Sequence, residues 1–383
     1  MGRGRERLLV FNCHEAWVYQ LGLLDYDLDI ICGLSGRYTR GWDSHIRPVP
    51  DRARLIRLEE ALASPERYTC IIAHNLTDLL DIRGRPEPRI LILHLALEAR
   101  IVEERPRLHA EQAKQLMHRY AELGAVHVVA VSHSKGRSWG FTEDIVPFAV
   151  DSADYPPCTG EIACGLRISN FVQQRKASLH WPFHERAFGG LPVRIVGHNP
   201  GMAGVAPSGD WDHLKALLRT CRFYIHTAHP DLEDGYNMAT VEAMAAGLPV
   251  LGNKHPTSVV EHGVNGFVSD DPDGLRDYAR LLLDDRDLAL RMGRQARLTV
   301  EQRFSVEAFQ SGMGRAIASA RMKRECLGTH GPHTLTAGTG TDAGRQTHPV
   351  RSKRRIVELP REPGRISSAA QTESPGTTPG RGR

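Results

Sequence analysis

The sequence predicts an α/β protein made of two consecutive units, each with a parallel β-sheet that helices cover on both faces. Short, continuous apolar runs alternate with helix-like stretches, which is typical of buried parallel strands. This alternation stops near residue 150 and then starts again. The 383 residues are too many for one ordinary domain and suit two domains with a tail.

The first unit is expected over residues 1–155. Helical patterns occupy Arg52–Leu62 and Pro106–Leu123. The apolar runs that we expect to be its strands are Leu8–Phe11, Leu28–Cys32, Cys70–Ala73, Ile90–His94, Val126–Val131 and Ile145–Phe148. A linker follows at Asp151–Glu161, where Pro156 and Pro157 interrupt both patterns.

The second unit is expected over residues 156–305. Its strands are predicted at Cys164–Ile168, Val193–Val196, Phe223–His226, Leu248–Gly252 and Gly266–Val268. Its helices are predicted at Asp212–Leu218, Met238–Ala246, Gly274–Leu283 and Leu288–Gln302. Asp271 and Pro272 supply a cap and a first-turn proline to the third of these helices. Two such units in succession predict two Rossmann-like domains.

A disordered tail is expected over residues 326–383. From Thr329 onward the chain is rich in Gly, Thr, Ser and Pro, so it cannot bury enough apolar surface to offset the entropy of ordering. Basic residues cluster at Arg351–Arg355 and before Arg7. They are interpreted as solvated termini, and the alternative is a weak association with anionic membrane surfaces.

Composition indicates an ordinary globular protein. Apolar residues make up 41% and charged residues 25%, and the net charge of +4 is too small to predict nucleic-acid binding. Seven irregularly spaced cysteines predict reduced thiols in a cytoplasmic protein rather than a zinc site or a disulfide framework. The run Leu8–Phe11 is too short for a signal peptide, and no run approaches the roughly 20 apolar residues of a membrane span.

The stretch Thr227–Val268 carries the most chemical information. A polar loop, Pro230–Asn237, follows a predicted strand, and a helix then runs to Gly247, where glycine tolerates a left-handed cap. Open parallel sheets bind ligands at the carboxyl ends of their strands. The backbone N–H groups of residues 237–240 open the helix and form a site for phosphate. Asp234 and Glu242 add carboxylates that accept hydrogen bonds from sugar and ribose hydroxyls, which together favours a nucleotide sugar.

These residues resemble the donor-binding motif of the retaining glycosyltransferases of family 4. The run Glu242–Val250 reads Glu-Ala-Met-Ala-Ala-Gly-Leu-Pro-Val and matches that family's Glu-Ala-Met-Ala-x-Gly-x-Pro-Val pattern. Gly263–Gly266 matches the Gly-x-Asn-Gly turn that follows it. The first glutamate of the family's E-x(7)-E pair falls on Asp234, and this shorter acid is expected to shift the position or preference of the sugar. Glu233 would replace it only after a rearrangement of the loop.

The resemblance implies a GT-B fold, in which two Rossmann-like domains face each other. The domain over 1–155 would lie on the acceptor side, the domain over 156–305 would bind the nucleotide sugar, and a helix over 306–325 would pack back on the first domain. Asp234 would hold the transferred sugar and Glu242 the ribose. The donor would also contact Gly235, Tyr236, Asn237, Met238 and Ala239.

The resemblance also implies cations that neutralise the donor diphosphate. The family carries Gly-Arg-x5-Lys after the first strand of its second domain. Here Asn170 stands at the arginine position and Lys176 at the lysine position, with Arg175 beside it. One cation is therefore missing or supplied from elsewhere, and Arg175 and Lys176 would carry more of the compensation. The alternative for both residues is a solvated charged surface.

His94 is the catalytic candidate of the first unit. It ends a predicted strand, and the family often carries a histidine there that faces the transferred sugar; the alternative is a satisfied core histidine. His74 and Ser132–Lys135 end neighbouring strands and are expected at the same edge. No Asp-x-Asp motif has a supporting context, so we expect neither a metal nor a cofactor.

The predicted function is sugar transfer from a UDP- or GDP-sugar to a hydroxyl acceptor, with retention. The acceptor would be a glycan, a lipid-linked molecule or a small molecule. The family's N-terminal glycine-rich loop is replaced here by Phe11–Ala16, so the resemblance says little about the acceptor. Two alternatives stay open: an epimerase of the same fold, and a non-catalytic nucleotide-sugar-binding module, which the departures at Asp234 and Asn170 would fit.

Overall fold

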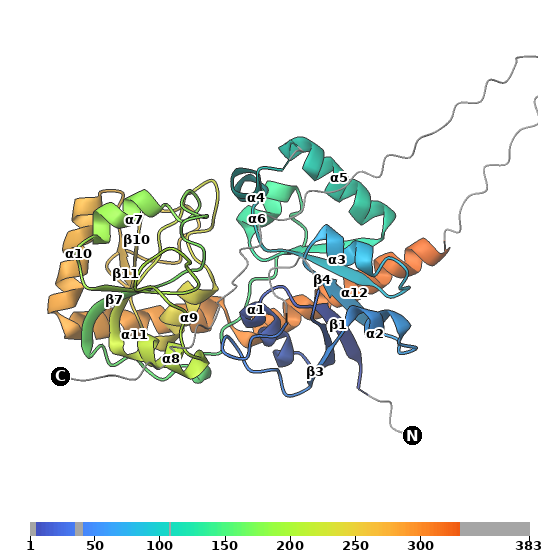
Figure 1. Cartoon of the computed structure of the whole chain (residues 1–383), viewed down its shortest axis with the longest axis horizontal. Helices are drawn as coiled ribbons and strands as arrows, with labels where there is room; N and C mark the ends of the chain where they lie inside the picture. Colours follow the sequence, from blue (N-terminus) through green and yellow to red (C-terminus); the bar gives the residue numbers. More distant parts are fainter. Residues whose placement is uncertain (1–4, 35–40, 107–108, 330–383) are drawn as a thin grey trace, which may run out of the picture. The chain divides into compact units, whose positions relative to one another are not determined.

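The computed structural model describes residues 5–34, 41–106 and 109–329, all of which lie in one compact unit. The described residues form two β-sheets, of six and five strands, in which all paired strands are parallel. Helices flank both sheets (Figure 1). The predicted α/β class with two parallel sheets is therefore confirmed. The predicted domain boundaries stay predictions, and residues 330–383 of the expected tail lie outside the described residues.

The first sheet has the strand order β3-β2-β1-β4-β5-β6. Its strands are β1 (Arg7–Phe11), β2 (Asp27–Ile31), β3 (Ala53–Ile56), β4 (Cys70–Ala73), β5 (Arg89–Leu93) and β6 (Val126–Ala130). Successive side chains point to opposite faces, so Leu8 and Val10 join one apolar core while Leu9 and Phe11 join another. The central strands β1, β4, β5 and β6 are buried on both faces, which is why they read as mainly apolar runs.

Different helices cover the two faces of the first sheet. The core that contains Leu9 includes side chains from α2 (Leu58–Ala63), α3 (Leu76–Asp81), α4 (Leu97–Glu104), α5 (Ala110–Leu123) and α6 (His133–Trp139). The core that contains Leu8 includes side chains from α1 (Glu15–Tyr19) and α12 (Val306–Thr329). The last helix of the described chain thus completes the core of the first sheet.

The second sheet has the strand order β11-β10-β9-β7-β8. Its strands are β7 (Ile162–Ile168), β8 (Val193–Val196), β9 (Cys221–Ile225), β10 (Val250–Gly252) and β11 (Gly266–Val268). Its helices are α7 (Trp181–Phe188), α8 (Trp211–Thr220), α9 (Met238–Ala246), α10 (Pro272–Asp284) and α11 (Arg286–Arg303). Asp271 caps α10 as predicted, since its carboxylate accepts from the backbone N–H groups of Asp273 and Gly274.

Two predicted elements of the first unit are wrong. Arg52–Leu62, expected as one helix, contains the edge strand β3 and then the start of the short helix α2. Because β3 is an edge strand with exposed side chains, it lacks the continuous apolar run of its neighbours. Ile145–Phe148, expected as a strand, makes a single bridge from Ile145 to Ala130. Pro147 has no N–H to extend that pairing.

Helix α12 is anchored to the first sheet by apolar contacts and by hydrogen bonds. Phe309, Met313 and Ile317 are almost fully buried in the core that contains Leu8 and Val10. The Gln310 amide donates to the backbone oxygen of Leu23 at 2.7 Å, and the Arg324 guanidinium donates to that of Pro86 at 2.8 Å. The helix includes residues 326–329, which the sequence assigned to the tail.

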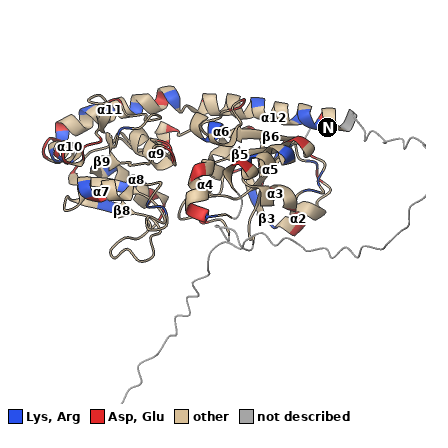
Figure 2. Cartoon of the chain, turned by 90° about the horizontal axis from the view of Figure 1, so that it is seen from above, with Lys and Arg blue, Asp and Glu red and all other residues tan. Residues whose placement is uncertain are grey.

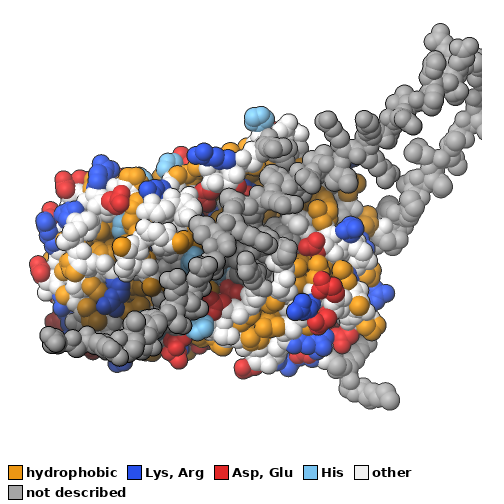
Figure 3. Space-filling view, in the orientation of Figure 1, with side chains coloured by type: hydrophobic (Ala, Val, Ile, Leu, Met, Phe, Trp, Pro, Cys, Tyr) orange, Lys and Arg blue, Asp and Glu red, His pale blue; other side chains and the backbone are white. Residues whose placement is uncertain are grey.

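Charged residues are spread over the molecule. Basic and acidic residues are mixed along α10 and α11, and α4 carries acidic residues (Figure 2). On the face drawn in Figure 3, Lys and Arg side chains alternate with Asp and Glu. None of the helices in the described part of the chain is long and apolar enough to cross a membrane.

Candidate functional site

Helix α9 lies at the centre of the candidate site. Its residues from Thr240 to Ala246 are buried, and Gly247 ends it with a φ of 88°, as predicted. Asn237 caps its start, where the side-chain oxygen accepts from Thr240 N–H at 2.9 Å and the Thr240 hydroxyl accepts from Asn237 N–H at 3.3 Å. Two of the four N–H groups expected for phosphate are therefore used. Those of Met238 and Ala239 have no acceptor among the described residues.

Glu242 projects from α9 and is buried against a cation from the first unit. Its carboxylate forms a short ion pair with Arg47, and both side chains are at most 6% exposed. Arg47 also lies over the ring of Trp211, 4.5 Å from the centroid. Burial alone would lower the pKa of Arg47, but the Glu242 carboxylate reverses this effect and raises it. The expected ribose carboxylate is thus held in place by a guanidinium that the sequence analysis did not select.

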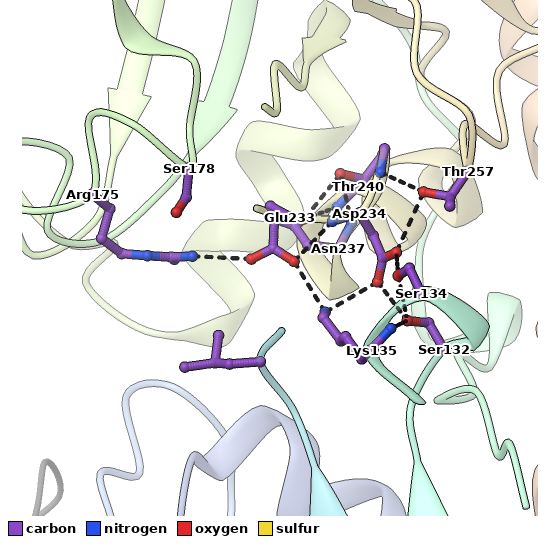
Figure 4. A network of polar contacts seen from close by, with 12 residues as sticks. Ser132, Ser134, Lys135, Arg175, Ser178, Glu233, Asp234, Asn237, Thr240 and Thr257 are labelled. Atoms are coloured by element: carbon purple, nitrogen blue, oxygen red, sulfur yellow. Dashed lines mark hydrogen bonds and ion pairs between the residues drawn. The ribbon is translucent and has the colours of Figure 1, made fainter. Parts of the chain in front are cut away.

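Asp234 lies at the centre of a polar network in the loop before α9 (Figure 4). Its carboxylate accepts hydrogen bonds from the hydroxyls of Ser132 at 2.7 Å, Ser134 and Thr257 at 3.3 Å. Lys135 Nζ lies 3.2 Å from its Oδ2 atom. Because Asp234 is only 2% exposed, these four partners satisfy a charge that would otherwise be costly to bury.

The network extends from Asp234 to Glu233, which the sequence analysis left outside the site. Glu233 Oε1 lies 3.0 Å from Lys135 Nζ, and Glu233 Oε2 lies 3.0 Å from an Arg175 nitrogen. Burial alone would raise the pKa of Glu233, but Lys135 and Arg175 lower it from 4.5 to about 2. Burial alone would lower the pKa of Lys135, but the charges of Glu233 and Asp234 raise it. The site therefore holds a charged lysine between two carboxylates.

The three candidate residues after β7 are placed differently. Arg175 joins the network through Glu233 and also pairs with Glu103 of α4 at 3.6 Å. Lys176 is exposed and makes no ion pair with a described residue. The Asn170 side chain accepts from His198 N–H at 2.8 Å and so ties the loop after β7 to the loop after β8. A further buried cation, Lys135, pairs with Asp234 in the loop before α9.

The remaining candidates in the loop are Gly235, which makes close backbone contacts, and Tyr236, whose ring packs against an aromatic neighbour. Gly235 is required by close packing, since an added Cβ would lie 2.8 Å from both the Ser258 nitrogen and the His255 Nδ1 atom. Its N–H donates to the Thr257 hydroxyl at 2.8 Å, so this group is already paired. The Tyr236 ring packs edge-on against Phe304, with centroids 5.3 Å apart.

His94 lies directly after β5, as expected, and contacts a second strand-end histidine. Its Nε2 atom lies 2.9 Å from His74 Nδ1 and 3.9 Å from Cys13 Sγ. Burial lowers the pKa of His94 well below its ordinary value, and the charges of His74 and Lys135 lower it further. His94 is therefore neutral at neutral pH and suits a hydrogen-bonding role better than that of a cation.

Sequence reasoning missed Arg47 and the full role of Ser132, Ser134 and Lys135. The Ser-x-Ser-Lys pattern directly after β6 gave a signal, because polar residues at a parallel strand end face a ligand edge. Arg47 gave no such signal. It lies in an irregular segment 195 residues from its partner Glu242.

The two parallel sheets have a GT-B-like fold, which they share with solved structures. HepE from Anabaena, in complex with UDP-glucose, is 15% identical with a TM-score of 0.60, over 82% of this chain and 99% of that one. Sucrose-phosphate synthase from Thermosynechococcus elongatus is 15% identical with a TM-score of 0.58, over 85% of this chain and 100% of that one. At this identity the likenesses show the fold.

Sequence comparison then gives the family. Residues 202–299, about a quarter of the chain, match the model of the glycosyl transferases group 1. An 83-residue stretch is 32% identical to the N-acetyl-alpha-D-glucosaminyl L-malate synthase of Bacillus anthracis. This match spans 21% of the chain and 22% of that relative, so about a fifth of the relative's length is matched. The resemblance found in the sequence is confirmed.

Proposed function

We propose that the chain transfers a sugar from a nucleotide-diphosphate sugar to a hydroxyl acceptor with retention of configuration. The observation that carries the proposal is the start of α9, where unpaired backbone N–H groups lie between the buried carboxylates Asp234 and Glu242. Such N–H groups favour a diphosphate, and the carboxylates favour hydroxyls. The UDP and UDP-glucose bound by HepE support a UDP-sugar as donor, with a GDP-sugar as the alternative.

In this proposal the donor diphosphate lies against the N–H groups of Met238 and Ala239. Arg175 and Lys176 stabilise the negative charge that develops on the leaving diphosphate, and Lys135 contributes once Asp234 exchanges it for sugar hydroxyls. No divalent cation is required for this step, because helix dipole and basic side chains supply the positive charge. The reaction takes place in the cytoplasm.

The carboxylates exchange partners when the donor binds. Glu242 releases Arg47 and accepts from the ribose hydroxyls, while Asp234 exchanges part of its serine and lysine contacts for sugar hydroxyls. The neutral ring of His94 contributes a hydrogen bond on the first-unit side of the sugar. Because buried carboxylates lose little by exchanging one set of donors for another, their present pairing is compatible with donor binding.

A non-catalytic nucleotide-sugar-binding module is the second candidate. It is favoured by the present pairing of both carboxylates and by the engagement of Asn170 with His198 instead of a phosphate. An epimerase of the same fold would use the same donor site without an acceptor.

The test is a panel of UDP- and GDP-sugars, with release of the nucleoside diphosphate as readout. Wild type is compared with Glu242→Gln and Glu242→Ala, with Lys176→Ala, and with Lys254→Ala as the control for an exposed lysine. We expect release from one donor, loss in both Glu242 variants, reduction in Lys176→Ala and no change in Lys254→Ala.

Other outcomes separate the alternatives. A donor-dependent rise in melting temperature without release favours the binding module, and conversion of the sugar without release favours the epimerase. If no donor gave release of the nucleoside diphosphate and none gave a thermal shift, a donor site at α9 would be refuted.

A further inference from the structure

Three ligand-type side chains gather at one edge of the first sheet. One atom each of Cys13, His74 and His94 lies within 4.8 Å of the other two. We propose that these residues form a binding site for Zn²⁺ or a similar borderline-soft cation, and that its occupation inhibits sugar transfer. The inhibitory part rests on the proposed function, whereas the binding part does not.

The topology of the sheet creates this cluster. Strands β1, β4 and β5 are adjacent and parallel, so their carboxyl ends lie at the same edge. His74 and His94 follow β4 and β5 directly, and Cys13 is the second residue after β1. Residues far apart in sequence thus converge, which is why the spacing of the cysteines gave no metal pattern.

The distances suit tetrahedral coordination after small movements. Zinc bond lengths of about 2.3 Å to sulfur and about 2.0 Å to nitrogen require ligand separations of about 3.3 Å for two nitrogens and about 3.6 Å for sulfur and nitrogen. The observed separations are 2.9 Å between the two imidazole nitrogens and 3.9 Å between Cys13 Sγ and His94 Nε2. These two separations therefore need to change by only a few tenths of an ångström, and the ligand atoms of Cys13 and His74 lie within 4.8 Å of each other.

The surroundings hold the rings in place and favour a cation. Trp17 packs edge-on against both imidazoles, with centroids 5.0 Å from His74 and 4.9 Å from His94. Burial raises the pKa of the Cys13 thiol, and the charges of Asp78 and Glu15 raise it further. The carboxylates of Asp78 and Glu15 would attract a bound dication at Cys13, whereas the positive charges of Lys135 and Arg100 oppose it at His94. The repulsion between Lys135 and a bound metal ion is weakened, because Lys135 is paired with Glu233 and Asp234.

Ligation leaves room for one further ligand. The described residues supply three ligands, so a water molecule would complete a tetrahedral site. On binding, the Cys13 thiol releases one proton to solvent and its sulfur bonds the metal. Both imidazoles stay neutral, and the ring that now donates across the His74 Nδ1–His94 Nε2 contact moves its proton to its other nitrogen. A metal at His94 removes that ring from the sugar.

Binding is tested first and without reference to activity. Protein free of a histidine tag and of metal is titrated with Co²⁺ and followed by visible absorption, and with Zn²⁺ by calorimetry. Cys13→Ser and His74→Gln remove single ligands. Cys32→Ser is the matched control, because Cys32 follows the neighbouring strand β2 but lies outside the cluster.

We expect one cobalt ion with a thiolate absorption band in wild type and Cys32→Ser, and affinity weakened at least about tenfold in Cys13→Ser and His74→Gln. Equal affinity in wild type and Cys13→Ser would overturn the site, as would no saturable binding in wild type.

Inhibition is tested on donor turnover. Zn²⁺ is expected to slow wild type and Cys32→Ser about tenfold, reversibly with a chelator, and to leave Cys13→Ser unaffected. Metal binding without inhibition would overturn the inhibitory role. A protein that binds the metal but turns over no donor would count against the proposed function and leave the binding result standing.

Discussion

Replacement of Lys135 by methionine tests the charge network that this lysine forms with the loop before α9. Methionine keeps much of the length and apolar bulk of lysine but removes the ammonium group between Glu233 and Asp234. All three side chains are at most 9% exposed, so solvent screens their interaction little.

The expected magnitude follows from the pKa of Glu233. Its lowering from 4.5 to about 2 corresponds to about 3 kcal/mol of stabilisation at neutral pH. Lys135 is the largest of the charges that lower it, and Arg175 remains in the variant. Loss of one partner of a buried pair costs about 3–5 kcal/mol. We therefore expect Lys135→Met to lower the free energy of unfolding by about 3 kcal/mol at pH 7.

The lowered pKa of Glu233 also determines how the free energy of unfolding changes with pH. A carboxyl group with a lowered pKa stabilises the folded protein above its unfolded pKa and loses this contribution as pH falls toward the folded pKa. The wild type should therefore lose this stability between pH 4.5 and about 2. In Lys135→Met the loss over this range should be smaller, because the pKa of Glu233 rises.

Urea unfolding followed by tryptophan fluorescence at pH 7 and pH 3.5 measures both effects. Lys254→Met, in which an exposed lysine is changed, is the control and should stay within about 0.5 kcal/mol of wild type. A loss of less than about 1 kcal/mol in Lys135→Met at pH 7 would refute the reasoning, since it would leave the ion pairs without a net contribution.

Three further predictions concern the same site. Asp234→Glu, which restores the family's acid, should destabilise the protein by about 1–3 kcal/mol in urea unfolding, because the carboxylate already fits Ser132 and Thr257; stabilisation would contradict this. Gly235→Ala should lower the melting temperature and abolish the donor-induced shift, while Gly84→Ala, with open space around it, should do neither. Arg47→Met leaves Glu242 buried without its cation and should cost about 3 kcal/mol. The donor should restore part of this loss, so the thermal shift on donor addition should exceed that of wild type; an equal shift would argue against ribose at Glu242.

The apolar strands of this fold were predictable from the sequence because burial on both faces of a sheet requires a continuous run of apolar residues. Strands buried on both faces, such as β4 and β5, have no polar side to interrupt the run. The edge strand β3 was missed because exposure of Arg54 and Leu55 gives it a mixed pattern that also fits a helix. Local chemistry sufficed for the helix end at Gly247, where glycine adopts the left-handed conformation. The capping box of Asn237 and Thr240 was not predicted, because their N–H groups were expected to bind phosphate.

The contacts that complete the site depend instead on tertiary packing. Arg47 and Lys135 reach carboxylates on elements far away in sequence, and no local pattern encodes such pairing. The sequence showed that Asp234 replaces the glutamate of the family's pattern. It did not show the hydrogen bonds that Asp234 accepts from two serines, because these serines follow a strand of the other sheet.

The packing of α12 has a consequence for the order in which the molecule assembles during translation. The face of the first sheet that holds Leu8 and Val10 is completed by Phe309 and Met313, which are synthesised after the last strand of either sheet. At about 5–20 residues per second, the nascent sheet waits roughly 10–40 s for this cover. During that interval its apolar face is a binding surface for chaperones and a hazard for aggregation. A chain that ends before Val306 would keep that face uncovered.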